Sequence, residues 1–416
     1  MVDLRFIRAH EEEVREAIRK KHERADLDAI LELDRQRREL LGQVETQKAQ
    51  RNSQSQAIGK RKAAGEDTSE AVAAMREVSR QIKKTDAKIS EIDGLIEQQL
   101  QWVPNLPHPD VPEGGEEANV ILRSWGKTRE EEGLRDHVAL GESLGLLDFQ
   151  SASRLSGSGF ATFTGNGARL QRALINFMLD LNAGAGYQEI RVPYAVRAAA
   201  LFGCGQLPKL RDDMYGISGD DLFLIPTAEV PLTNLFRGEQ IREENLPINL
   251  MAYSPCFRRE AGTYGKQTHG LIRLHQFDKV ELVKLVEPET SYDELDRLTA
   301  DAESVLQALE LPYRVVLLAA RDLSFAAAKT FDLELWAPGE RRWLEVSSCS
   351  NFLDFQARRI DLRYRPAGGK LRYLHTLNGS GVALPRLIVA VLEHYQTPEG
   401  AVRIPRALRP YMGGVE

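Results

Sequence analysis

The hydrophobic positions between residues 26 and 100 follow the spacing of a helix rather than the alternation of a strand. In the second half of this stretch they form an unbroken 3-4 alternation, at Met75, Val78, Ile82, Thr85, Ile89, Ile92 and Ile96. This spacing is typical of a coiled-coil seam, in which Thr85 is the one polar member. A weaker version of the pattern runs through the first half, at Leu27, Ile30, Leu41, Val44 and Ile58.

A turn signal and a proline-rich linker divide the chain. Gly65-Glu66-Asp67 separates the two halves of the heptad stretch, which predicts that two helices fold back as an antiparallel hairpin. Roughly 35 residues at about 1.5 Å each give an arm of roughly 50 Å. The linker from Val103 to Pro112 ends the second helix, because proline cannot continue the hydrogen-bond ladder. We therefore expect an N-terminal arm domain, residues 1–102, and a second domain, residues 103–416.

The second domain mixes strand-like and helix-like segments. We expect helices at 168–181 and 384–394, and strands near 189–192, 222–225, 313–318, 330–336 and 343–347, besides two strand-like segments at 255–260 and 270–281. Hairpin connections between several of these strands indicate an antiparallel β-sheet flanked by helices, so the fold class is α+β. The sequence has no P-loop and no GxGxxG after a strand, which leaves the parallel-sheet nucleotide folds without support.

The charge of the chain points to a local rather than a global attraction to nucleic acid. The formal net charge is -6, but no acidic residue lies between Thr46 and Gly65. The basic candidates for contact with RNA phosphates are Lys48, Arg51, Lys60, Arg61, Lys62, Arg76, Arg80, Lys83 and Lys84. A solvated coiled-coil surface would explain such charges as well. The acid-free tip favours RNA.

The remaining composition excludes several other classes of protein. Cys204, Cys256 and Cys349 lie far apart and form no CxxC pair, which argues against a disulfide framework and against a zinc site. No apolar run reaches membrane-spanning length, and the N-terminus has no signal-peptide core. We therefore expect a cytoplasmic protein with no membrane partner and no zinc. We also expect no DNA partner.

The densest chemistry lies in Pro255–Glu260 and Gly270–Glu281, which a polar loop from Ala261 to His269 connects. The arginine guanidinium group suits phosphate because it donates two parallel hydrogen bonds and stays charged. A phenylalanine ring can stack on a base, and glutamates can accept from an amine or bind magnesium. Charges that alternate on a hairpin are also typical of one wet and one buried face. The combination favours a triphosphate site whose loop folds over the nucleotide.

These two segments closely resemble motif 2 of class II aminoacyl-tRNA synthetases, in the form found in seryl-tRNA synthetases. The resemblance covers nearly the full chain: Gly186–Pro193 looks like motif 1, Leu377–Arg386 looks like motif 3, and Gly203–Lys209 and Thr227-Ala228-Glu229 look like serine-type signatures. It implies a homodimer that uses ATP to attach L-serine to serine tRNA through a seryl-adenylate, with the arm gripping the tRNA. It leaves open whether selenocysteine tRNA is charged as well.

The resemblance also implies roles for individual residues. Arg258 would hold the α-phosphate, Glu260 the adenine amine and Arg273 the terminal phosphate, while Phe277 would stack on adenine. Arg386 would approach the γ-phosphate, and Glu345 would bind magnesium together with Ser348; Arg258, Arg386 and Glu345 form the catalytic set. The other expected ATP contacts are Arg259, Leu274, Val346 and Ser347. The expected serine contacts are Thr227, Ala228, Glu229, Glu281, Asn378 and Ser380.

A serine site must read an ammonium group and a hydroxyl group by hydrogen bonds, because size alone discriminates by only a few kcal/mol. The two glutamates, Glu229 and Glu281, supply the carboxylates. Such a hydroxyl-reading pocket rejects alanine because its own polar groups would be left unpaired. No protein nucleophile is needed, since the serine carboxylate itself attacks the ATP.

The chain departs from the family pattern at three places. Ala319–Phe325 has lost the threonine and both glycines of a TGD-x-G-F segment, Pro385 and Leu387 stand where glycine and threonine are usual in motif 3, and Cys204 stands where threonine is usual. Proline in a first helical turn costs little, so we expect the helix after it to survive. We expect altered kinetics or inhibitor sensitivity rather than a dead enzyme, because every charged ligand is retained.

Two alternatives use the same scaffold. One is a paralogue that makes seryl-adenylate and loads a carrier protein, for which the basic arm would have no use. The other is a non-catalytic RNA-binding scaffold, against which the retained charged residues argue, because buried charges are costly to keep without a purpose.

Overall fold

A computed structural model describes residues 1–261 and 269–416 of the chain. Its contacts separate into two compact units, Val2–Pro104 and Asn105–Glu416, the second of which also includes Met1. We expected a boundary after residue 102, and the contacts place it at Pro104. The loop that we expected to fold over the nucleotide falls outside the described residues except at its ends, Ala261 and His269.

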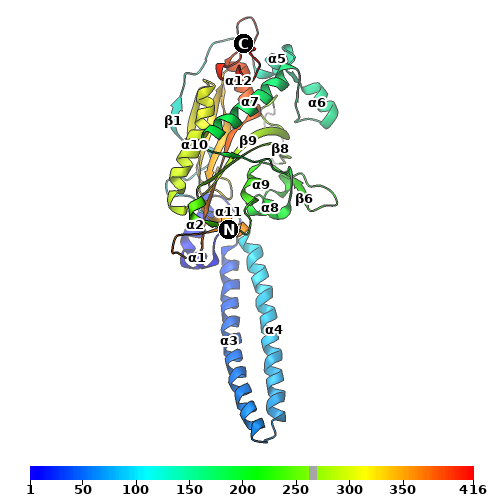
Figure 1. The fold of residues 1–416 in the computed structure, drawn as a ribbon, viewed down its shortest axis with the longest axis vertical. Coiled ribbons are helices and arrows are strands. Elements are labelled where there is room, and N and C mark those ends of the chain that lie inside the picture. Colours follow the sequence, from blue (N-terminus) through cyan, green and yellow to red (C-terminus); the bar gives the residue numbers. More distant parts are fainter. Residues whose placement is uncertain (262–268) are drawn as a thin grey trace. The chain divides into compact units, whose positions relative to one another are not determined.

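The first unit contains the predicted helical hairpin. Two short helices, α1 (Leu4–Ala9) and α2 (Glu11–Lys20), precede the long helices α3 (Leu27–Ala63) and α4 (Ser69–Leu100) (Figure 1). The predicted seam of α4 is confirmed: Ile82, Ile89, Ile92 and Ile96 are buried, and the remaining seam positions, Met75, Val78 and Thr85, are half-buried. Most of the positions between them are exposed. Hydrophobic periodicity therefore builds this element.

Apolar and polar contacts together fix the register between the two long helices. Val44 packs with Ile82 and Ile89 in the seam. The Lys48 ammonium lies 3.2 Å from an Asp86 carboxylate oxygen, and Arg37 forms an ion pair with Asp93. Because α3 has 37 residues, it is about 55 Å long at about 1.5 Å per residue.

An eight-stranded sheet forms the centre of the second unit. Its strand order is β1-β10-β11-β12-β15-β9-β8-β4, and every neighbouring pair is antiparallel except β4 and β8. The strands are β1 (Val120–Trp125), β4 (Gln188–Glu189), β8 (Ile248–Phe257), β9 (Gln276–Val286), β10 (Tyr313–Leu317), β11 (Lys329–Ala337), β12 (Arg342–Asn351) and β15 (His375–Ala383). The predicted antiparallel sheet flanked by helices is confirmed, with one parallel pair at its edge.

Helices cover this sheet, and short elements surround it. The helices are α5 (His137–Ser143), α6 (Phe149–Ser156), α7 (Asn166–Gly184), α8 (Ala198–Gly203), α9 (Glu229–Asn234), α10 (Ser291–Ala308), α11 (Phe355–Ile360) and α12 (Leu384–His394). The other strands are β2 (Leu147–Asp148), β3 (Thr162–Phe163), β5 (Ala195–Arg197), β6 (Leu222–Leu224), β7 (Gln240–Arg242), β13 (Arg363–Arg365) and β14 (Arg372–Tyr373). Single 3-10 turns occupy Glu116–Ala118, Arg211–Asp213, Glu243–Asn245, Pro288–Thr290 and Arg406–Leu408.

The two predicted helices of this unit are confirmed as α7 and α12, but two strand predictions were wrong in extent. The strand expected to reach residue 192 ends at Glu189, shortly before Pro193, which has no N–H to donate to a ladder. The motif 2 strands pair only as far as Phe257 and Gln276. Glu260 and Gly270 both adopt left-handed φ angles, 53° and 55°, which a continuous strand does not tolerate.

Alternation along β9 separates the core from a polar face. Val280 and Leu282 belong to the main core together with residues of α7, α10 and α12, which pack on that side of the sheet (Figure 1). Val283 and Leu285 pack instead with α9 and α11 on the opposite side. Lys279 and Glu281 share this second side, because side chains two apart on a strand point the same way. Among the described residues, no helix combines the length and apolarity needed to cross a bilayer.

The seam of the hairpin provides a stability test. Ile82 is 4% exposed in the seam, and Val72 on the same helix is 37% exposed. Ile82→Ala should lower the free energy of unfolding of the hairpin by about 2 kcal/mol or more, because it leaves a cavity. Val72→Ala, the control, should cost well under half of that. Native-state hydrogen exchange of the α4 amides measures both, and equal effects would contradict the seam.

Candidate active site

Two adjoining pockets lie on the polar side of β9. The first, here called the cationic pocket, is lined by Arg258, Glu260, Leu271, Ile272, Arg273, Leu274, Phe277, Lys279, Glu345, Val346, Ser380, Ala383, Pro385 and Arg386. The second, here called the carboxylate pocket, includes Cys204, Gln206, Thr227, Glu229, Glu281, Phe325, Ser348 and Asn378. Both pockets are lined by Arg258, Lys279, Glu345 and Ser380. A ligand that fills both would therefore pass these four side chains.

Four cations meet in the cationic pocket from three parts of the fold. Arg258 follows β8, Arg273 and Lys279 belong to the returning limb of motif 2, and Arg386 lies in the first turn of α12. The Arg386 Nε donates to the Ile272 carbonyl oxygen at 3.1 Å, and its Nη1 donates to the Glu345 carbonyl oxygen at 2.6 Å. This arrangement suits a polyanion, since backbone oxygens hold the Arg386 guanidinium group before any ligand arrives.

Two of the expected nucleotide contacts are engaged within the protein itself. The Glu260 carboxylate, expected at the adenine amine, forms an ion pair with Arg273. The Phe277 ring, expected to stack on adenine, lies 5.1 Å from the Arg258 guanidinium carbon. A nucleotide that used these groups as expected would have to exchange these contacts for its own.

The carboxylate pocket holds two buried glutamates. The Gln356 Nε2 donates to a Glu229 oxygen at 2.7 Å, and the Asn378 Nδ2 donates to a Glu281 oxygen at 3.2 Å. Glu281 also forms an ion pair with Lys279. Burial, and next the negative charge of Glu281, raise the pKa of Glu229 to about 7. Such a pair is poised to accept hydrogen bonds from a cationic ligand.

A β-bulge places Glu345 and Ser348 on one face of β12. The register with β11 shifts between Leu333 and Glu334, so that Ser347 and Glu345 pair with consecutive residues and one extra residue is inserted in β12. Residues three apart on a regular strand would point to opposite faces. Because of the bulge, both Glu345 and Ser348 line the carboxylate pocket.

An oxygen-rich corner at this bulge fits a divalent cation. Asp332 on β11 pairs in register with Ser348. Its Oδ1 is buried and has no hydrogen-bond partner in the described part of the chain. Burial raises the pKa of Asp332 well above its usual range, and the nearby Glu345 carboxylate raises it further. A carboxylate, a hydroxyl and a second carboxylate are ligands that magnesium prefers.

The structure brings most of the expected site residues together, and a few lie elsewhere. Arg259 is exposed and lines neither pocket as the described residues define them; its backbone N–H donates to the Asp213 carbonyl. Ala228 and Ser347 are buried behind the pocket walls, and the Ser347 Oγ donates to the Ser380 carbonyl oxygen at 2.5 Å. All the other residues expected to contact ATP or serine line one pocket or both.

Sequence reasoning missed three of the side chains at this site. Lys279 lines both pockets, and its alternation with Glu281 on a predicted strand was a signal that could have found it. Gln356 and Asp332 had no such signal, because helix α11 and the bulge bring them in from distant parts of the chain.

Some of the departures from the family pattern line the carboxylate pocket, and others lie in the core or in helix α12. Phe325 and its neighbour Ser324 line the carboxylate pocket, so the altered segment forms part of its wall. Cys204 lies there too and is buried, and the Asn234 Nδ2 donates to its sulfur at 3.5 Å. Leu387 is buried in the main core instead, and α12 starts at Leu384 with Pro385 in its first turn, so the prediction that this helix survives is confirmed.

The chain is similar to known proteins over its whole length. Family models match at residues 1–107, seryl-tRNA synthetase N-terminal domain, and at residues 215–395, tRNA synthetase class II core domain (G, H, P, S and T). The serine--tRNA ligase of Desulfitobacterium hafniense (strain DSM 10664 / DCB-2) is 51% identical over 99% of each chain.

Solved structures agree with these matches. The seryl-tRNA synthetase from Pyrococcus horikoshii, complexed with ATP, superposes with a TM-score of 0.95 at 37% identity, covering 99% of this chain and 98% of that one. The cytoplasmic serine-tRNA ligase from Naegleria fowleri, in complex with AMP, gives 0.92 at 28% identity, covering 100% and 98%. The chain therefore belongs to the seryl-tRNA synthetase family of class II aminoacyl-tRNA synthetases.

Proposed function

We propose that this chain uses ATP to attach L-serine to serine tRNA through a seryl-adenylate. The observation that carries this proposal is the junction of the two pockets at Arg258, Lys279, Glu345 and Ser380. A site that joins an amino acid to a nucleotide needs a carboxylate-rich end for the ammonium group and a cationic end for the phosphates. It also needs both substrates to meet at one point.

The first step needs positioning and charge neutralisation rather than a protein nucleophile. A serine carboxylate oxygen forms a bond to the ATP α-phosphorus, while the bond to the bridging oxygen breaks and pyrophosphate leaves with the electron pair. Arg258, at the junction, would hold the α-phosphate where negative charge develops. Arg273 and Arg386 would hold the other phosphates in the cationic pocket. In the second step a hydroxyl oxygen of the terminal tRNA ribose bonds to the seryl carbonyl carbon and gives up its proton. The bond from that carbon to the adenylate oxygen breaks, and AMP leaves with the electron pair.

The carboxylate pocket would hold serine. Glu229 and Glu281 would accept hydrogen bonds from the ammonium and hydroxyl groups, and Thr227, Asn378 and Ser380 would complete the set. The other residues expected at the nucleotide are Glu260, Leu274, Phe277 and Val346, which line the cationic pocket. Alanine would leave this pocket with unpaired buried oxygens, which is how a small pocket achieves specificity.

Magnesium is the cation that the oxygen corner at β12 fits. Glu345, Ser348 and Asp332 would hold it, and when bound it supplies positive charge beside the phosphates. Glu345 also contacts Arg386, whose Nη1 lies 3.5 Å from one of the Glu345 carboxylate oxygens.

The first unit would bind the tRNA. Basic side chains are spread along its long helices, and Lys48, Arg61 and Arg80 each have an acidic neighbour, Asp86, Glu66 and Glu77 respectively. The stripe at Lys60, Arg61 and Lys62 lies at the last turn of α3, where no acid of the same helix follows. Contact with an RNA backbone at this tip would release counterions.

We also infer that the chain works as a homodimer. Strand β1 is at the edge of the main sheet, and Val120, Ile121, Leu122 and Trp125 are all exposed on it. Exposed apolar edge strands are a liability that a partner subunit would remove. The carrier-loading and non-catalytic alternatives gain no support, because relatives that match this chain over nearly its full length are named serine--tRNA ligases.

The arginines provide the first test of the mechanism. Arg258→Gln and Arg386→Gln should each lower serine-dependent ATP–pyrophosphate exchange by about 100-fold or more, because each removes a charge held for the phosphates (about 2.7 kcal/mol at about 1.36 kcal/mol per tenfold). Arg242→Gln, an exposed control in the same unit, should leave the rate within about twofold. Exchange that survives both pocket substitutions would contradict the assignment.

The pKa of Glu229 predicts how serine binding depends on pH. Because this pKa is about 7, the side chain gains a proton as the pH falls from 8 to 6, and the protonated form does not attract an ammonium group. The KM for serine should therefore rise by about tenfold over that range, while the KM for ATP changes little. In Glu229→Gln the KM for serine should be high and independent of pH. A slope that persists in this variant would rule out Glu229 as its origin.

Shortening the arm separates the two steps. Lys48 and Asp86 lie opposite each other, so joining them through four glycines, which span up to about 13 Å, removes residues 49–85 without opening the base of the hairpin. Aminoacylation of serine tRNA should fall by about 100-fold or more, because the phosphate contacts are lost, whereas serine-dependent exchange should stay within about threefold.

A companion variant keeps the arm and changes only its charge. Lys60, Arg61 and Lys62 are replaced by glutamine, which should weaken tRNA binding and flatten its salt dependence. Full tRNA charging by the shortened enzyme would show that the arm has no role in tRNA recognition.

A further inference from the structure

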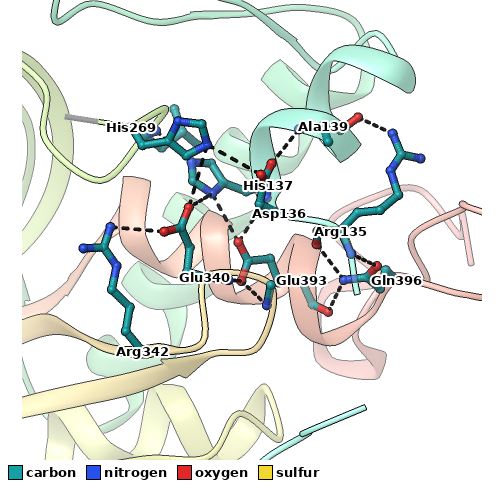
Figure 2. Close-up of polar contacts among 11 residues, drawn as sticks. Arg135, Asp136, His137, Ala139, His269, Glu340, Arg342, Glu393 and Gln396 are labelled. Atoms are coloured by element: carbon teal, nitrogen blue, oxygen red, sulfur yellow. Dashed lines mark hydrogen bonds and ion pairs between the residues drawn. The ribbon is translucent and has the colours of Figure 1, made fainter. Parts of the chain in front are cut away.

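A buried histidine–glutamate cluster lies behind the cationic pocket and plays no part in the chemistry described so far. His137 at the start of α5 and Glu393 near the end of α12 are both fully buried, and the His137 Nδ1 lies 3.2 Å from a Glu393 oxygen (Figure 2). Glu340, from the turn between β11 and β12, approaches the same nitrogen at 3.5 Å. Neither His137 nor Glu393 lines either pocket as the described residues define them.

The hydrogen bonds of His137 fix its tautomer. The Leu271 backbone N–H donates to the His137 Nε2 at 3.0 Å, so Nε2 carries a lone pair and the ring proton of the neutral imidazole resides on Nδ1. That proton then points to Glu393. A metal ion at this cluster would need the Nδ1 lone pair, which the proton occupies. The cluster is therefore a hydrogen-bonded junction and not an ion site.

Glu393 connects this junction to a second part of the active site. One of its oxygens also accepts from the His137 backbone N–H at 3.0 Å, and the other accepts from the backbone N–H groups of Gly339 and Glu340, at 2.8 and 3.2 Å. Gly339 and Glu340 lie just before β12, the strand that carries Glu345. A single buried carboxylate thus holds α12, α5 and the start of β12 together.

Helix α12 is consequently tied at both ends to the same short segment. Near its start, Arg386 donates to the Ile272 carbonyl. Near its end, Glu393 reaches Leu271, the adjacent residue, through His137. Leu271 and Ile272 both line the cationic pocket, directly before Arg273. The position of the Arg386 guanidinium therefore depends on whether this segment is held in place.

A contact between two rings strengthens the same connection. His269, from the same returning limb, lies edge-on to His137 with ring centroids 5.6 Å apart, and its Nε2 is 3.6 Å from an Asp136 oxygen (Figure 2). Asp136 in turn caps α5 by accepting from the Ala139 N–H at 2.8 Å. The returning limb of motif 2 is thus fastened to the start of α5 at two neighbouring positions, Leu271 and His269.

We propose that His137 is a positioning residue for adenylate formation: by joining Leu271 to Glu393, it holds Ile272, and through it Arg386, in the geometry that receives ATP. The proposal rests on the proposed function, since it assigns His137 a role in setting the ATP end of that site. The serine end is built from α9, β9 and β15, so it should be affected far less.

Two substitutions separate the bonds of His137. Asparagine places an N–H near the position of Nδ1 and so keeps the donor to Glu393, but it leaves the Leu271 N–H without an acceptor. Glutamine places a carbonyl oxygen near the position of Nε2 and so keeps that acceptor. His137→Asn should raise the KM for ATP in pyrophosphate exchange by about tenfold or more and leave the KM for serine within about twofold. His137→Gln should recover most of this loss, because the backbone N–H of residue 137 still donates to Glu393.

His394→Asn is the matched control. His394 lies on the same helix next to Glu393, is half-buried, and its Nε2 donates to the Trp336 carbonyl oxygen at 3.0 Å, a bond that does not reach residues 271–272. This variant should lose thermal stability as His137→Asn does but keep the wild-type KM for ATP. If His394→Asn and His137→Asn raise the KM for ATP equally, or if both substrates are affected alike, His137 is merely structural and the proposal fails.

Direct titration with ATP keeps this test independent of the proposed function. If the wild-type chain shows no serine-dependent exchange, the proposed function fails, and calorimetric ATP affinities of the three variants still decide whether His137 orders the pocket. If the wild type is active and His137→Asn binds and uses ATP as the wild type does, the positioning role is refuted while the proposed function stands.

Discussion

The alternation of side chains along β9 is the constraint on which the catalytic unit depends. One side of this strand presents Val280 and Leu282 to the core, and the other presents Lys279 and Glu281 to the pockets. A shift of register by one residue would exchange the two sides and bury charges among α7, α10 and α12. The core therefore fixes the position of the catalytic charges at the same time as it stabilises the sheet.

Burying these charged side chains is energetically unfavourable, and close hydrogen-bond and ion-pair partners offset part of that free energy. Glu229, Glu281 and Lys279 are almost fully buried, which would be strongly unfavourable for isolated ions. Lys279 neutralises Glu281, Gln356 donates to Glu229, and Asn378 donates to Glu281. The raised pKa of Glu229 shows that the compensation is incomplete. A cationic substrate would supply the missing positive charge. The groups that are costly to bury are therefore the ones that would gain most from binding the substrate.

Periodicity and motif order predicted much of the fold. Local spacing was sufficient to predict the heptads of the arm, the hairpin turn, helices α7 and α12 and the antiparallel sheet. The residues around Arg258, Glu281 and Arg386 were named through family resemblance, and the structure gathers most of them at two joined pockets. Glu260 was placed at an adenine amine, yet in the structure it pairs with Arg273, a contact that no spacing rule reveals.

What could not be predicted depends on long-range packing. The bulge that brings Glu345 and Ser348 to one face is a register shift between two strands, and neither strand shows it alone. His137 forms hydrogen bonds with Leu271 and Glu393, which are 134 and 256 positions away along the chain, so no local stretch of sequence links them. Similarly, the sequence shows Asp332 only as one position of an alternating strand. The structure shows that one of its buried oxygens has no hydrogen-bond partner among the described residues.

The central claim is that the two pockets are the two ends of one adenylation site. A crystal structure with a non-hydrolysable seryl-adenylate analogue, in which a sulfamoyl group replaces the phosphate, tests it most directly. We predict that the seryl end lies between Glu229 and Glu281, the sulfamoyl group at Arg258, and the adenosine beside Phe277. An analogue seated in another part of the molecule, or with Arg258 and Arg386 turned away from it, would contradict a single adenylation site.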